Sequence, residues 1–258
     1  MTANYHTHTP RCHHAVGSER EFIEKAIEIG FCELGFSDHA PMPYGNGYTS
    51  HIRMSLEETE DYVNTLLDLR REYEKDIKIF IGFEAEYYPA VFDRFIDFIG
   101  QYPIDYLIMG QHWRNNEYDG PYHGAATDDV ESLRAYVDQV IEGLSTGKFS
   151  YLAHPDLVNF VGDEKLYRKE ITRLIEFTEK HDVPLEINML GAQHGRYYPL
   201  DNFWTVASEL GAKTIIGCDG HNPRDIVQPD SIERVKKLIE KHKGLNIIDK
   251  LEFKPIKN

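Results

Sequence analysis

The sequence predicts an α/β fold in which parallel strands curl into a distorted (β/α)7 TIM-like barrel, with residues 1–258 forming a single domain. Short apolar runs alternate with longer amphipathic stretches, as in proteins built from repeated strand–helix units. The apolar runs are continuous rather than alternating, which is typical of strands buried on both faces of a parallel sheet. No linker, low-complexity tract or solenoid repeat divides the chain.

Seven segments have the length and apolar content of buried strands. They are residues 3–8, 32–38, 77–85, 105–112, 149–155, 184–190 and 214–221. An eighth strand within NIIDKLEF (246–253) is left open. The alternative fold with this alternation is an open doubly wound sheet. It loses support because no GxGxxG follows the first strand and no Walker motif occurs.

Helix signals fill the segments between the strands. SERE (18–21) and SLEE (55–58) have the spacing of capping boxes, in which a Ser side chain and a Glu side chain bond each other's backbone amides. Asp201 is predicted to cap the helix that ends at Gly211. Helices are expected over 63–73, 127–143, 163–181, 202–210 and 231–242.

Composition and charge narrow the class of ligand. A formal net charge of -15 repels phosphate backbones, so we expect no nucleic acid partner. No apolar run approaches the roughly 20 residues that span a bilayer, and the N-terminus has no secretory pattern. Cys12, Cys32 and Cys218 are odd in number and form no CxxC pair, so we expect a cytoplasmic protein without disulfides. The sequence is silent on oligomeric state.

Side chains that can bind metal ions follow one predicted strand after another. In a parallel barrel the carboxyl ends of the strands surround one mouth, where active sites form, so we expect these residues to converge. In chain order they are His6, His8, His13, His14, Asp38, His39, Glu84, Glu86, His112, His154, Asn188, Asp219 and His221.

The types and spacing of these residues predict a multinuclear metal site. His6 and His8 are two apart on a strand and point to the same side, so one ion can take both. Neutral imidazole with carboxylate suits Zn, Mn or Fe, and Glu84 has two oxygens with which to bridge two ions. The ligands exceed the needs of one ion, which predicts two or three divalent ions.

Each residue taken singly also has a structural interpretation. A lone histidine at a strand end is usually a hydrogen-bonded structural residue, and only the combination favours a metal site. Asp38 is a candidate to orient a metal ligand or donate a proton, and a purely structural role in a turn would explain its position nearly as well. Cys218 is expected to be a small core residue, and Cys12 could lie near the metals but is expected to pack or to support a ligand.

Seven motifs together resemble one family: HTHTPRCHHA, SDHAP, GFEAEY, GQHW, AHPD, EINML and GCDGH. They are similar to the polymerase and histidinol phosphatase (PHP) superfamily over about His6 to His221. The stretches SDHAP, RMSLEETEDYV, IFIGFEAEYYP and EIN, in this order, most resemble its histidinol-phosphate phosphatase branch. This resemblance implies a distorted (β/α)7 barrel with a trinuclear metal centre.

The resemblance also implies a ligand set for each ion. His14 is preferred over His13 because the family's loop histidine lies six residues beyond the second histidine of the HxH pair. The chain departs from its relatives in GQHW, which lacks their serine, and at Gln193, near where they commonly carry a basic residue. The implied sets are His6, His8, Glu84 and Asp219 for one ion, Glu84, His112 and His154 for a second, and His14, His39 and His221 for a third.

The activity that this resemblance implies is hydrolysis of L-histidinol phosphate to L-histidinol and inorganic phosphate, in histidine biosynthesis. Two adjacent ions would lower the pKa of a shared water, and the resulting hydroxide would attack phosphorus while the ions neutralise phosphate charge. The candidate catalytic residues are Asp38, His39 and Glu84. The candidate substrate contacts are Arg196 with His194, Arg114 and Glu86, although both arginines have surface positions as an alternative.

Other functions remain open from the residues alone. The runner-up is another small-molecule phosphoesterase, acting on a nucleotide or sugar phosphate. A phosphotyrosine protein phosphatase or a nuclease is less favoured, since a nuclease wants a basic groove. A metal store or sensor is the non-catalytic alternative, and it would keep its ions coordinatively saturated, whereas hydrolysis needs an open position.

Overall fold

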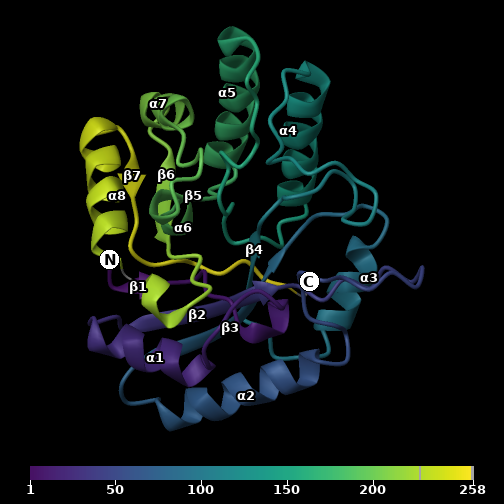
Figure 1. The fold of residues 1–258 in the computed structure, drawn as a ribbon, viewed down its shortest axis with the longest axis vertical. Helices are drawn as coiled ribbons and strands as arrows, with labels where there is room; N and C mark the ends of the chain where they lie inside the picture. The colour runs from purple at the N-terminus through teal and green to yellow at the C-terminus, as the bar shows by residue number, and fades with distance from the viewer. Residues whose placement is uncertain (227, 257–258) are drawn as a thin grey trace.

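Short parallel strands form a curled sheet with helices on its outside in the computed structural model, which describes residues 1–226 and 228–256 (Figure 1). The strands pair in the orders β1-β2-β3-β4 and β5-β6-β7, and every pairing is parallel. They are β1 (Ala3–Asn4), β2 (Glu33–His39), β3 (Lys78–Ala85), β4 (Tyr106–Met109), β5 (Leu185–Asn188), β6 (Lys213–Gly217) and β7 (Asn246–Ile247).

Isolated bridges join these two sets of strands at both edges. Leu152 forms parallel bridges to Met109 and to Leu185, so it connects β4 with β5. Thr7 bridges Gly220, which brings the segment after β1 against the segment after β6. The sheet therefore curls back on itself, which confirms the predicted barrel and excludes the open doubly wound alternative.

Several predicted strands are shorter in the structure. The segment 149–155 bonds to its neighbours over residues 150–153, with its two parallel bridges at Leu152, and it ends where His154 has a left-handed backbone (φ 70°) and Pro155 has no amide hydrogen to donate. The segment 184–190 ends at Asn188, whose side chain caps the next helix by accepting from the amide of Gly191. The open question of an eighth strand has an answer in β7, which pairs with β6 over two residues.

The helices surround the sheet: in Figure 1, α1 and α2 lie below β1, β2 and β3, α4, α5 and α7 lie toward the top, and α8 lies at the left beside β7. No helix in residues 1–226 and 228–256 is long and apolar enough to cross a membrane. The helices are η1 (Pro10–Cys12), α1 (Glu19–Glu28), α2 (Thr59–Glu72), α3 (Phe92–Ile99), α4 (Val130–Ser145), α5 (Glu164–Lys180), α6 (Met189–Gln193), α7 (Asp201–Glu209), η2 (Pro223–Ile226) and α8 (Pro229–Lys241).

The capping predictions have mixed outcomes. Ser18 and Glu21 form the full capping box of α1. Ser55 and Glu58 exchange the expected bonds, but they do so in a turn that precedes α2. The prediction for Asp201 is wrong: it is the first residue of α7, and its carboxylate instead accepts from Lys241 and His242 at the end of α8.

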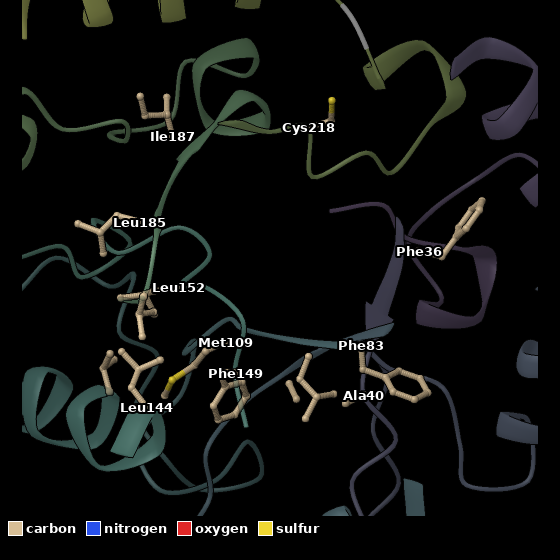
Figure 2. Close-up of a cluster of buried hydrophobic side chains, with 14 of the residues drawn as sticks. Phe36, Ala40, Phe83, Met109, Leu144, Phe149, Leu152, Leu185, Ile187 and Cys218 are labelled. Carbon is tan, nitrogen blue, oxygen red and sulfur yellow. The ribbon is translucent and has the colours of Figure 1, made fainter. Parts of the chain in front are cut away.

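The outward faces of the strands carry the main apolar core. Figure 2 shows Phe83, Met109, Leu152 and Leu185 in this layer, with Leu144 of α4 packed beside them. Full burial of each such side chain stabilises the fold by about 1.5–3 kcal/mol. The core thus fixes the strands from outside and leaves the inner face free for other side chains.

The inner face is aromatic toward the amino ends of the strands. Tyr5, Tyr106 and Tyr151 are buried there, and Phe253 from the C-terminal segment stacks on Tyr106 with ring centroids 4.8 Å apart. The Tyr106 hydroxyl donates to the backbone oxygen of Tyr5 at 2.8 Å. This layer fills the barrel below the site described next.

Candidate metal centre

Glu84 lies at the centre of the carboxyl-end cluster. It pairs in register with His39, so β2 and β3 present the two side chains side by side. Its two oxygens face different histidines, which is the arrangement a bridging carboxylate needs. Oε1 lies 2.7 Å from His154 Nε2 and 3.6 Å from His112 Nε2, and Oε2 lies 3.0 Å from His39 Nδ1, 3.6 Å from His8 Nε2 and 3.7 Å from His6 Nε2.

Glycine leaves room for this carboxylate. A Cβ atom at Gly110, just beyond β4, would lie 1.8 Å from Oε1 of Glu84, so no other residue fits without displacing the carboxylate. His154 and Asp219 are non-glycine residues with left-handed backbones (φ 70° and 52°), which turn the chain at the ends of the segments that carry them. Strained backbone of this kind clusters at functional sites.

The Nε2 atoms of His6 and His8 are buried and have no hydrogen-bond partner. They lie 3.5 Å and 3.1 Å from Oδ1 of Asp219. Ligand atoms of a tetrahedral metal ion with bonds of 2.0–2.1 Å are about 3.3–3.4 Å apart, close to these separations. Unpaired nitrogens facing carboxylate oxygens at this spacing fit a divalent metal ion.

A second group of imidazoles lies at the outer side of the cluster. The Nε2 atoms of His14 and His221 are 3.1 Å apart, and a ring nitrogen of His39 completes a set within 4.8 Å. His14, and not the neighbouring His13, joins this group. Cys12, which the sequence analysis set aside, also comes within 4.8 Å of ring nitrogens of His8 and His221.

The electrostatics of the cluster favour bound positive charge. Burial by itself would raise the pKa of Glu84, but the imidazoles of His39, His112 and His6 hold it well below its usual value. The pKa of Asp219 is likewise held far down against its burial by His6 and His8. Both carboxylates are therefore ionised at neutral pH, as metal ligands must be.

Asp38 contacts the backbone and side chains of the segments that carry His8 and His39. One of its oxygens accepts from the amide and the hydroxyl of Thr9, and the other accepts from the His39 amide at 2.8 Å and lies 3.4 Å from His8 Nδ1. Since both oxygens are engaged with the protein, the structure favours the orienting role for Asp38 over proton donation.

Glu186 is a functional candidate that the sequence analysis missed. Its Oε1 lies 2.8 Å from His6 Nδ1 and also accepts from the Tyr151 hydroxyl, so it fixes the ring of His6. Gly217 gives it room, because a Cβ there would lie 1.8 Å from the same oxygen. A signal was present: Glu186 stands two residues before Asn188 and therefore shares its face of β5.

The structure places Glu86, a predicted substrate contact, beside Arg53. Its side chain is buried in an ion pair with Arg53 (2.9 Å) and accepts from the amides of His112 and Trp113. It does not line the cavity over the cluster, as far as the described residues define that cavity. These contacts make Glu86 a support for the loop that carries His112, and its contact with substrate stays a prediction.

Arg114 also falls outside the described lining of this cavity, in contrast to the other predicted contacts Arg196 and His194. Arg196 Nη1 donates to the Tyr198 hydroxyl at 2.7 Å, which holds the guanidinium at the cavity wall. The cavity has a volume of about 550 Å³. Its lining comprises His14, Val16, His39, Ile52, Glu84, His112, Trp113, Tyr122, His154, Leu190, His194, Arg196, Tyr198, Asp219, His221, Asn222 and Asp225.

Comparisons with known proteins find relatives over most of the chain. A protein of Deinococcus radiodurans named a probable histidinol-phosphatase is 27% identical over 228 residues, covering 86% of this chain and 86% of that protein. The histidinol-phosphatase of Bacillus subtilis is 24% identical over 255 residues, covering 86% and 94%.

A solved structure has the same fold. Histidinol phosphate phosphatase from Lactococcus lactis, complexed with zinc, L-histidinol and phosphate, matches with a TM-score of 0.73 and 19% identity, covering 96% of this chain and 95% of that chain. The sequence profile of the PHP domain matches residues 4–189, well over half of the chain. The chain therefore belongs to the PHP domain family.

Proposed function

We propose that this chain is a metal-dependent phosphatase that hydrolyses L-histidinol phosphate to L-histidinol and inorganic phosphate, and that the whole chain works as one catalytic unit. The buried, unpaired Nε2 atoms of His6 and His8 carry the metal part of the proposal, because a bound cation is what such nitrogens lack. The names of the relatives support the substrate.

Three divalent ions fit the cluster in this proposal. Glu84 would contribute Oε2, which lies beside His6 and His8, to the first set, and Oε1, which lies beside His112 and His154, to the second. Zinc is our first choice, since imidazole-rich sets suit it and the Lactococcus lactis relative is described with it. The proposed sets are His6, His8, Glu84 and Asp219; Glu84, His112 and His154; and His14, His39 and His221.

The side chains of the chain then have distinct tasks. Divalent ions bound there supply Lewis-acid activation of water and neutralise the charge on phosphate. Arg196, fixed by Tyr198, donates to phosphate oxygens from the cavity wall, and His194 lines the same wall. Asp38 and Glu186 hold the rings of His8 and His6 in place.

A panel of phosphate esters tests the proposal. The metal-loaded enzyme is assayed for phosphate release from L-histidinol phosphate, a nucleoside monophosphate, a sugar phosphate and phosphotyrosine, before and after treatment with a chelator. We expect kcat/KM for L-histidinol phosphate to exceed the others by at least about 100-fold, because a site built around polar groups rejects ligands that lack them.

The other outcomes identify the alternatives. A higher kcat/KM for a nucleotide or sugar phosphate would assign the chain to another phosphoesterase activity. No release from any ester by protein with its metals fully loaded would indicate a metal store or sensor.

A further inference from the structure

Among the described residues, three carboxylates line the cavity: Glu84, Asp219 and Asp225. Glu84 and Asp219 face the imidazoles of the metal centre. Asp225, in η2, belongs to none of the groups whose potential ligand atoms lie within 4.8 Å of one another. Asp225 therefore lies outside the proposed metal sites, and its carboxylate is available to a different partner.

The surroundings of Asp225 leave its negative charge uncompensated. The residue is only 9% exposed. Its Oδ1 accepts from the neutral amide of Gln193 at 3.1 Å, and no ion pair joins it to a cationic side chain in the described part of the chain. A largely buried carboxylate is costly unless a cation or several donors compensate it, so this one is suited to bind a cation that enters the cavity.

The cavity wall also carries side chains of opposite charge. Arg196 is the arginine on the described wall, and it is placed to meet an anion, whereas Asp225 is placed to meet a cation. L-Histidinol phosphate carries both charges: a phosphate group at one carbon and an ammonium group at the next. A molecule with only the phosphate would leave the Asp225 carboxylate desolvated without a cationic partner.

We propose that Asp225 binds the ammonium group of the substrate and thereby selects phosphate esters of amino alcohols over esters without an amine. This inference rests on the proposed phosphatase function and assigns one of its specificity determinants. A charge-assisted hydrogen bond of this kind changes binding by about 10- to 100-fold.

The test compares two substrates in three proteins. The substrates are L-histidinol phosphate and its amine-free analogue, 3-(imidazol-4-yl)propyl phosphate, and the proteins are the metal-loaded wild type, Asp225→Asn and the control Asp230→Asn. Asp230 is an exposed carboxylate in the first turn of α8, so its variant loses the same charge away from the cavity. Metal content and melting temperature are measured for each protein.

We expect the ratio of kcat/KM values, amine over amine-free, to fall by about 10- to 100-fold in Asp225→Asn and to stay at the wild-type value in Asp230→Asn. An equal fall for both substrates, an unchanged ratio, or loss of metal from Asp225→Asn would overturn the assignment. If Asp225→Asn does not fold, Asp225→Glu provides the test. It keeps the charge at a shifted position, so its ratio must change, and a wild-type ratio would count against the proposal.

A failure of the proposed substrate is distinguishable from a failure of this inference. If the wild type prefers an unrelated ester, the phosphatase substrate is wrong, and the same three proteins are compared on phosphoethanolamine and ethyl phosphate. A preference for the amine that disappears in Asp225→Asn would still support ammonium recognition. The absence of any preference in the wild type would refute it.

Discussion

The two ends of the barrel interior differ in whether their buried polar atoms have hydrogen-bond partners. At the amino end, Tyr106 and Phe253 stack, and the Tyr106 hydroxyl has its partner in the backbone of Tyr5. At the carboxyl end, the Nε2 atoms of His6 and His8 are equally buried and have none. The same strands carry both layers, so the sheet provides position, and the side chains at each end decide between stability and ligand binding.

Removal of metal should have the largest effect of the perturbations, and it should act on the carboxyl end of the barrel. After dialysis against a chelator, we expect kcat/KM to fall at least about 1000-fold, because the cluster loses its charge-stabilising cations. The melting temperature should also fall, since ions that bind only the folded state stabilise it. Readdition of zinc should restore both kcat/KM and the melting temperature. Retained activity in metal-free protein would contradict a catalytic metal centre at the carboxyl end.

Glu186→Gln tests whether Glu186 positions His6 for metal binding at the carboxyl end. Without the charge beside Nδ1, His6 should hold its ion less well, and we expect metal affinity to fall by about 10- to 100-fold. Competition with a chromophoric chelator measures the affinity. Glu170→Gln is a matched control, because Glu170 is a buried carboxylate paired with Arg134 and Arg173 on the outer helices. Equal affinity in the two variants would remove the positioning role of Glu186.

Phe253→Ala tests the opposite end. Loss of the ring from the aromatic layer should lower the free energy of unfolding by about 1–3 kcal/mol, less than for a fully buried phenylalanine because Phe253 is partly exposed. Urea unfolding measures the change. The kcat/KM of the folded, metal-loaded variant should stay within about threefold of wild type, and a large loss of activity would mean that the two ends are coupled.

Ser18→Ala perturbs neither end and should have the smallest effect. It removes the capping box at the start of α1, outside the barrel interior. We expect a loss of about 1 kcal/mol in unfolding free energy. Metal content and activity should match the wild type, and a fall in metal content would show that the rim depends on α1 as well.

The repeated strand–helix pattern predicts the barrel well, and it also predicts which side chains meet. His6 and Asp219 are far apart in the sequence and come together because the carboxyl ends of parallel strands share one rim. The strand predicted at 149–155 ends earlier than expected, because the backbone at His154 is left-handed. Such local geometry leaves no periodic signal in the sequence.

Site residues beyond the strand ends are harder to predict. The orientation of Glu86 depends on Arg53, which arrives from a loop distant in the sequence, and nothing in the pattern links the two. Glu186 is different, because strand alternation places it on the face of Asn188. Asp225 lies in a short 3₁₀ helix after the last rim histidine, so only the folded chain reveals that it lines the cavity.

The most direct test of the metal centre is the metal content of Glu84→Gln beside that of wild type, determined by elemental analysis after identical purification. Because Oε2 of Glu84 faces His6 and His8 of the first set and Oε1 faces His154 of the second, we predict that this one substitution removes more than one ion per chain and abolishes phosphate release. A variant that keeps the full wild-type metal content and activity would show that Glu84 bridges nothing.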